Sequence, residues 1–205
     1  VNNNEKIIRS IGVDKIDDTI ITAVTKNGMI KKMRLKDFAV SRYSKPITMF
    51  KLKDDDEVVS VSNNSGKDTV IVTNSGYALR FNTDEIPEFG LKAGGVKAIK
   101  LSDDDDVSSA FVISENKEYL AIFTDKNTAK RIKVEDIEMS SRAKKGSLII
   151  KSPKSKKYSI FKAFNISSKS IVGIVDGSIG YLKSSDINIM DKQSVGSVIT
   201  KKNID

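Results

Sequence analysis

The sequence predicts an all-β fold, a propeller-like array of repeated four-stranded units of about 50 residues. Turn-like segments recur along the chain, each lies between Val- and Ile-rich runs, and only 3 of the 205 residues are proline. The turns end at Gly28, Gly76, Asn127 and Gly177, which lie 48, 51 and 50 residues apart. Gly and Asn tolerate the positive φ of tight hairpin turns, and β-branched runs favour strands. We therefore expect one hairpin in each unit and almost no helix.

The repeat divides the chain into four units, which we expect to form a single domain or the C-terminal part of one. The predicted units are residues 18–66, 67–116, 117–168 and 169–205. Residues 6–11 match the register of Glu57–Val61, 51 residues later. They are predicted to be a strand of a preceding unit, or the strand that closes the ring onto the fourth. Because Val1 is not an initiator methionine, we also expect the chain to be a segment of a longer protein.

Acidic residues recur at two positions of the repeat. One precedes an apolar residue at Asp37, Glu85, Asp136 and Asp186. Each of these carboxylates is expected to accept a backbone N–H at a short helical or turn start. The acidic runs Asp54–Glu57 and Asp103–Asp106 occupy equivalent places, and no EF-hand spacing is present. We interpret both runs as solvated turns and expect no metal site.

Composition excludes several kinds of chemistry. The chain has no histidine and no cysteine, which rules out Ser-His-Asp and Cys-His catalysis, the usual zinc sites and disulfides. It contains no Walker A loop and no dinucleotide-binding glycine motif. No apolar run approaches the roughly 18 residues that a membrane span requires. We expect no cofactor, no catalytic residue and no membrane partner in this chain, and a cytoplasmic location.

Positive charge indicates a polyanionic partner, with nucleic acid as the first expectation. The net charge is +8, and residues 139–175 hold nine basic residues and no acidic one. The nine are Arg142, Lys144, Lys145, Lys151, Lys154, Lys156, Lys157, Lys162 and Lys169. Lys and Arg bind phosphates without reading sequence, so binding would be salt-sensitive and mostly non-specific. The alternatives are a solvated surface that only keeps the protein soluble, and a protein-interaction module that binds an acidic partner.

Three segments carry a resemblance to a known family: Thr25–Lys32, Arg42–Pro46 and Gly90–Lys97. From Ile7 onward the chain resembles the C-terminal domain of the A subunits of bacterial type IIA topoisomerases, most closely the topoisomerase IV branch. The resemblance implies a β-pinwheel, a propeller-like disc whose outer rim binds and bends double-stranded DNA. It also implies two partners, the remainder of the A subunit with its catalytic tyrosine and the ATPase B subunit. ATP and Mg²⁺ would be used by those parts, in strand passage, relaxation and decatenation.

The gyrase branch of this family carries a Gln-Arg-Arg-Gly-Gly-Lys-Gly box, and no intact box occurs here. The nearest counterpart is residues 41–47, in which only Arg42 matches the box. This departure favours topoisomerase IV over gyrase and argues against strong chiral wrapping of DNA. A C-terminal domain of a gyrase A subunit that lacks an intact box is the alternative.

The residues expected to contact DNA are cations that would follow one rim of the disc. They are Lys32, Arg42, Lys45, Arg80, Lys92, Lys97, Lys130, Arg131, Arg142, Lys144, Lys145 and Lys192. We expect the strongest contact at Arg142, Lys144 and Lys145. A further lysine column recurs at Lys51, Lys100, Lys151 and Lys201. It is interpreted either as part of the same basic rim or as edge residues that discourage strand pairing.

Overall fold

Antiparallel strands build almost all of the regular structure of this chain. The computed structural model describes residues 5–40, 45–53, 55–63, 65–114, 117–175 and 179–199. The strands are β1 (Ile20–Thr25), β2 (Met29–Arg34), β3 (Val58–Ser62), β4 (Asp68–Thr73), β5 (Tyr77–Asn82), β6 (Val96–Lys97), β7 (Val107–Val112), β8 (Tyr119–Thr124), β9 (Thr128–Lys133), β10 (Ser147–Leu148), β11 (Ile160–Ile166), β12 (Ile171–Val175), β13 (Ile179–Lys183) and β14 (Ser197–Val198). Helix in these ranges is limited to the 3-10 turns η1 (Leu35–Phe38), η2 (Thr83–Glu85), η3 (Val134–Asp136) and η4 (Ser184–Asp186). The all-β prediction is confirmed.

The second, third and fourth units each contribute a short strand to the sheet of the unit before them. The sheets have the orders β3-β1-β2-β6, β10-β5-β4-β7, β11-β8-β9-β14 and β12-β13. Strand β6 lies within the second sequence unit, yet it completes the first sheet by pairing with β2. Strands β10 and β14 do the same for the second and third sheets. These three sheets are therefore four-stranded as predicted, but they do not coincide with the sequence units.

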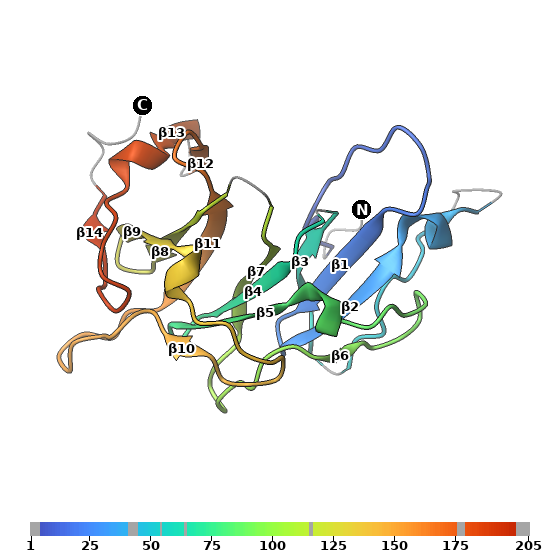
Figure 1. The fold of residues 1–205 in the computed structure, drawn as a ribbon, viewed down its shortest axis with the longest axis horizontal. Coiled ribbons are helices and arrows are strands. Elements are labelled where there is room, and N and C mark those ends of the chain that lie inside the picture. The colour runs from blue at the N-terminus through green and yellow to red at the C-terminus, as the bar shows by residue number, and fades with distance from the viewer. Residues whose placement is uncertain are drawn as a thin grey trace.

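The sheets are arranged around a common centre. Figure 1 shows β3, β7 and β11 toward the middle of the molecule, and β6, β10 and β14 on its outer margin. Strand β7 packs against both β3 and β11. Residues 6–11 form no strand within the described segment 5–19, and Ile8 and Arg9 instead lie against the inner strands. The assignment of residues 6–11 to a preceding unit stays a prediction.

Apolar side chains from adjacent sheets form the core. One cluster joins Val24 and Ile30 of the first sheet to Ile71, Leu79 and Phe81 of the second. Equivalent clusters join the second sheet to the third and the third to the fourth. Because each sheet buries a face only against its neighbour, the packing orients every unit relative to the next.

The hairpin turns confirm the expected role of their tip residues. Gly28, Gly76 and Asn127 have φ angles of 78°, 90° and 55°. The fourth tip, Gly177, lies outside the described residues. Positive φ costs an L-residue with a Cβ far more than glycine, which explains the residue types at these tips.

Two of the four recurring acids stabilise short turns as expected. The Oδ2 atom of Asp37 accepts the backbone N–H of Arg34 at 3.3 Å, and Asp136 accepts that of Lys133 at 3.2 Å. Glu85 is one methylene longer, and its carboxylate instead accepts the backbone N–H of Arg142 in the next unit. These acids are predicted to accept hydrogen bonds within their own unit, whereas the hydrogen bond of Glu85 links two units.

The acidic runs cap the hairpins. Asp56 Oδ1 accepts the N–H of Asn27 at 2.9 Å, and Asp105 Oδ1 accepts that of Ser75 at 2.9 Å. These runs are therefore more than solvated turns, although no group of metal-ligating side chains occurs among the described residues. Within the same ranges, no helix is long and apolar enough to cross a membrane.

Candidate nucleic-acid interface

The outer margin is built from three joints, at each of which a loop of one unit packs on the sheet before it. The loops are residues 90–97 on β2, 141–148 on β5 and 191–198 on β9, hereafter the first, second and third joints. Each joint is closed by a backbone hydrogen bond from the lysine column. Lys51, Lys100 and Lys151 donate their N–H groups to the carbonyls of Ala93, Lys144 and Gln193 at 3.2, 2.9 and 2.8 Å. These three lysines thus belong to the joints, where their side chains are exposed, and Lys201 lies outside the described residues.

A glycine in each loop allows this close approach. Gly95, Gly146 and Gly196 have φ angles of 69°, 82° and 89°. A Cβ on Gly146 would lie 2.7 Å from the carbonyl carbon of Ala78 and closer still to its oxygen. The backbones of neighbouring units therefore touch at these points, and only glycine fits between them.

The second joint gathers exposed cations. The backbone carbonyls of Lys97 and Ala98 accept bonds from the Arg142 guanidinium and the Ala143 N–H, which holds the two units together. Around this contact the side chains of Lys97, from the loop of the first joint, and of Lys100 and Lys144 are exposed. We call these three residues the rim lysines. Among the described residues, none of the three is within ion-pair distance of a carboxylate.

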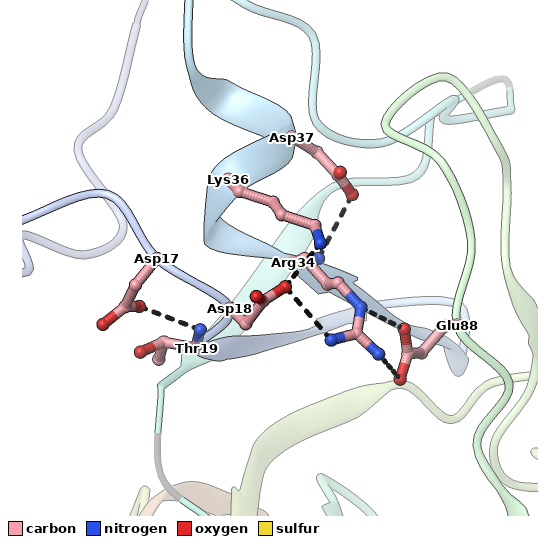
Figure 2. Close-up of polar contacts among 7 residues, drawn as sticks. All are labelled: Asp17, Asp18, Thr19, Arg34, Lys36, Asp37 and Glu88. Atoms are coloured by element: carbon pink, nitrogen blue, oxygen red, sulfur yellow. Dashed lines mark hydrogen bonds and ion pairs between the residues drawn. The ribbon is translucent and has the colours of Figure 1, made fainter.

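Paired charges characterise the first joint instead (Figure 2). Arg34 holds Glu88 of the second unit with two hydrogen bonds of 2.8 and 3.0 Å, and its Nη1 donates to Asp18 at 3.2 Å. Lys36 Nζ lies 2.6 Å from the same Asp18 carboxylate. Hydrogen bonds from Lys36 and Arg34 lower the pKa of Asp18 below its ordinary value. Arg34 and Lys36 are therefore neutralised locally and have less positive charge to offer a phosphate than the rim lysines.

Several cations predicted to contact DNA are occupied within the protein. Lys32, Arg80 and Arg131 each donate to a backbone carbonyl at the 3-10 turn of the following unit. Their acceptors are Thr83 at 3.2 Å, Val134 at 3.3 Å and Ile187 at 2.6 Å. Arg80 also forms an ion pair with Asp68. These side chains fasten one unit to the next.

Lys130 is buried, although it was predicted to contact DNA. Its side chain is 1% exposed, and Nζ donates to the carbonyls of Ile149, Asp191 and Lys192 at 2.6, 3.2 and 2.7 Å. Burial lowers the pKa of Lys130 to about 8. An ammonium group has three donors, so Lys130 retains none for a phosphate. Lys31 is bound in the same way at the first joint, to carbonyls of residues 90, 91 and 93.

Among the remaining predicted residues, some side chains are exposed and others already donate a hydrogen bond within the protein. Arg142 is half-buried, with its Nε donating to the Glu85 carbonyl at 3.2 Å, and Lys192 donates to the Asp136 carbonyl at 3.2 Å. Lys145 is exposed and lies over the Tyr77 ring at 4.4 Å. Lys45 and Lys92 are exposed, and Arg42 lies outside the described residues. Contact with DNA stays a prediction for every residue named in the sequence analysis.

The repeats themselves match a known family. Residues 20–65, 67–114 and 118–157 each match the family described as DNA gyrase C-terminal domain, β-propeller. The chain belongs to the DNA gyrase C-terminal domain family. The matched segments fall within the first three sequence units, so the family repeat and the period found in the sequence are the same.

Members of the gyrase C-terminal domain family from topoisomerase IV are similar along nearly the whole chain. The A subunit of DNA topoisomerase 4 from Streptococcus pneumoniae is 35% identical over 96% of this chain and 26% of its own length. The Bacillus subtilis protein of that name is 29% identical over 96% of this chain and 25% of its own length. The chain therefore spans about a quarter of these relatives. The predicted resemblance to the A subunit of topoisomerase IV is confirmed.

Solved structures agree with this assignment to the gyrase C-terminal domain family. The crystal structure of a C-terminal domain of DNA topoisomerase IV superposes with a TM-score of 0.90 at 31% identity, covering 99% of this chain and 65% of that one. A DNA gyrase A C-terminal domain superposes with a TM-score of 0.82 at 19% identity, over 100% of this chain and 70% of that one. The second likeness shows the fold alone. Both bear out the propeller-like β-pinwheel.

Proposed function

We propose that this chain binds double-stranded DNA along its outer margin, with little sequence preference. The rim lysines carry this proposal, because they are three exposed lysines around the contact between the loops of the first and second joints, with no carboxylate partner among the described residues. Lysine binds phosphate as a point charge and reads no bases. Lys45, Lys92 and Lys145 are exposed as well and extend the surface available to a phosphate backbone.

We also propose that the chain serves the A subunit of a topoisomerase IV, where it would hold and modestly bend a DNA segment for strand passage, relaxation and decatenation. The relatives named above support this role, since they are A subunits of that enzyme. In this proposal the partners are the remainder of the A subunit, together with the ATPase B subunit, in the cytoplasm at the nucleoid. Bond breakage, Mg²⁺ and ATP belong to those partners, and this chain supplies DNA affinity alone.

A salt titration with a matched control tests DNA binding. Fluorescence anisotropy of a labelled duplex would be measured for the wild type and for the triple variant Lys97→Gln/Lys100→Gln/Lys144→Gln. If each rim lysine contacts one phosphate, the slope of log affinity against log salt falls by about 2.7, since each contact contributes about 0.9.

The control removes the same charge from lysines that already face carboxylates. It is the triple variant Lys36→Gln/Lys126→Gln/Lys133→Gln, whose side chains pair with Asp18, Asp125 and Glu135. We expect its salt slope to stay close to that of the wild type. Equal losses in the two variants would mean that net charge alone attracts DNA, and an unchanged slope in the rim variant would remove the proposed surface.

A further inference from the structure

A cavity of about 320 Å³ lies at the centre of the molecule, away from the outer margin. Its walls are the inner strands β3, β7 and β11, which lie near the middle of Figure 1, together with Ile8 and Arg9 of the N-terminal segment. Pockets for small ligands have volumes from about 300 Å³ upward. A DNA duplex is far too wide for this space, so the rim and the cavity are separate sites.

All charged side chains that line the cavity are cationic. They are Arg9, Lys117 and Lys162, and no carboxylate lines the cavity within the part of the chain that the structure describes. Lys162 is half-buried, and burial, with the charge of Lys6 as a second cause, lowers its pKa. Glu57 lies in an adjoining groove with Lys6 and Lys162, and its carboxylate is 3.9 Å from Lys26.

Lys162 differs from the other buried cations of this chain. Lys31 and Lys130 each donate to three carbonyls, and Arg131 donates to Ile187. Within the described ranges, no hydrogen bond or ion pair joins the Lys162 ammonium to another group. A half-buried cation without a partner is costly, and an anionic ligand in the cavity would offset that cost.

The neutral polar groups of the wall are already satisfied by the protein. Ser60 Oγ donates to the Ala110 carbonyl, Ser109 Oγ accepts the Ala163 N–H, and the Asn165 amide donates to the Lys117 carbonyl. The free binding capacity of the cavity therefore resides in its cations. Three cations around a small volume complement an anion that carries several charges on closely spaced oxygens.

We propose that the central cavity binds a small polyvalent phosphate, of the class of inorganic pyrophosphate, through Arg9, Lys117 and Lys162. The proposal is independent of DNA binding at the rim. The phosphate oxygens would accept charge-assisted hydrogen bonds from the three side chains, with Lys162 as the deepest contact. The same chemistry could come from a DNA phosphate group, and the experiment below separates the two sources.

Isothermal titration calorimetry of the intact chain with sodium pyrophosphate tests the site. We expect saturable binding at one site, weakened about tenfold or more by Lys162→Met and largely retained by Lys162→Arg, because a charge-assisted bond is lost only in the first variant. Lys154→Gln, in an exposed turn, is the control and should bind as the wild type does. If Lys162→Met does not fold, Arg9→Gln and Lys117→Gln take its place, since both side chains are exposed.

Two results would overturn the proposal. The first is a titration that shows no central site, either because the wild type does not bind pyrophosphate or because Lys162→Met binds it equally well. The other is loss of pyrophosphate binding in the triple rim variant, or its displacement by saturating duplex DNA, because the anion would then occupy the outer margin. Pyrophosphate binding that persists in the presence of saturating DNA supports a separate central site.

Discussion

Replacing Gly146 by alanine would break a close backbone contact between the second and third units. Gly146 has a φ of +82°, and a Cβ there would lie 2.7 Å from the Ala78 carbonyl carbon and 3.0 Å from Leu79 Cα. Both neighbours are backbone atoms of β5, so neither can rotate away. We expect Gly146→Ala to push residues 147–148 of β10 off the edge of the second sheet.

The cost follows from two contributions. The left-handed backbone region costs an L-residue about 1–2 kcal/mol. Separation of β10 from β5 weakens the short ladder in which Ser147 and Leu148 face Ala78 and Tyr77, at about 1 kcal/mol for each hydrogen bond. Together we expect a loss of about 3 kcal/mol, which corresponds to a fall in Tm of about 6–12 °C for a chain of this length.

Thermal unfolding followed by circular dichroism would measure this loss. Gly90→Ala is the matched control, because no atom lies within 4 Å of a Cβ at Gly90 and its φ lies outside the positive range. We expect that control to unfold at the wild-type temperature or slightly above it. If Gly146→Ala and Gly90→Ala unfolded at the same temperature, the joint would not depend on the contact between the two backbones.

Three other outcomes are expected. Lys130 has a pKa of about 8 in the folded protein, against 10.5 for an ordinary lysine, so between these values the unfolded chain binds the extra proton and wild-type stability should rise with pH. Urea unfolding at pH 7 and pH 10 would measure the free energy of unfolding of the wild type and of Lys130→Met. The wild type should gain up to about 3 kcal/mol relative to the variant at pH 10, and a difference between the two proteins that is the same at both pH values would contradict this expectation. Asp105→Ala leaves the Ser75 N–H without its acceptor and should cost about 1 kcal/mol in urea unfolding, whereas no change would mean that water replaces the carboxylate. The chain alone, incubated with ATP, Mg²⁺ and supercoiled plasmid, should leave the plasmid supercoiled on an agarose gel, and relaxation by a topoisomerase-free preparation would reveal catalytic groups that the sequence does not indicate.

The sequence predicts the hairpins well, because their signal is local. A Gly or Asn tip between two β-rich runs is sufficient for a hairpin, as Gly28 and Asn127 demonstrate. The exchanged strands β6, β10 and β14 are only two residues long. Such a strand has no alternation of its own and is defined by the edge it meets, so no periodicity analysis could assign it to the preceding sheet.

The candidate site was predicted less well, because charge in a sequence does not reveal burial. Lys130 and Lys144 are both predicted to contact DNA, yet one is 1% exposed and the other lies at the surface. What separates them is whether a loop from the next unit covers the side chain. One signal was available, since Lys130 stands two residues before Ile132 in a predicted strand and therefore shares its face of the sheet.

Each outer strand is contributed by a later unit to the sheet before it, so coupling between units has a direction along the chain. Local unfolding of the third unit would take β10 away from the second sheet, whereas the described part of the fourth unit contributes no strand to that sheet. Local unfolding therefore propagates from a later unit to the one before it, opposite to the order of synthesis. For the same reason, an early unit is fully protected from hydrogen exchange only when the unit after it has folded. Hydrogen exchange should show this polarity, with β5 deprotected by Gly146→Ala and β9 little affected, and equal deprotection of both strands would argue for symmetric coupling.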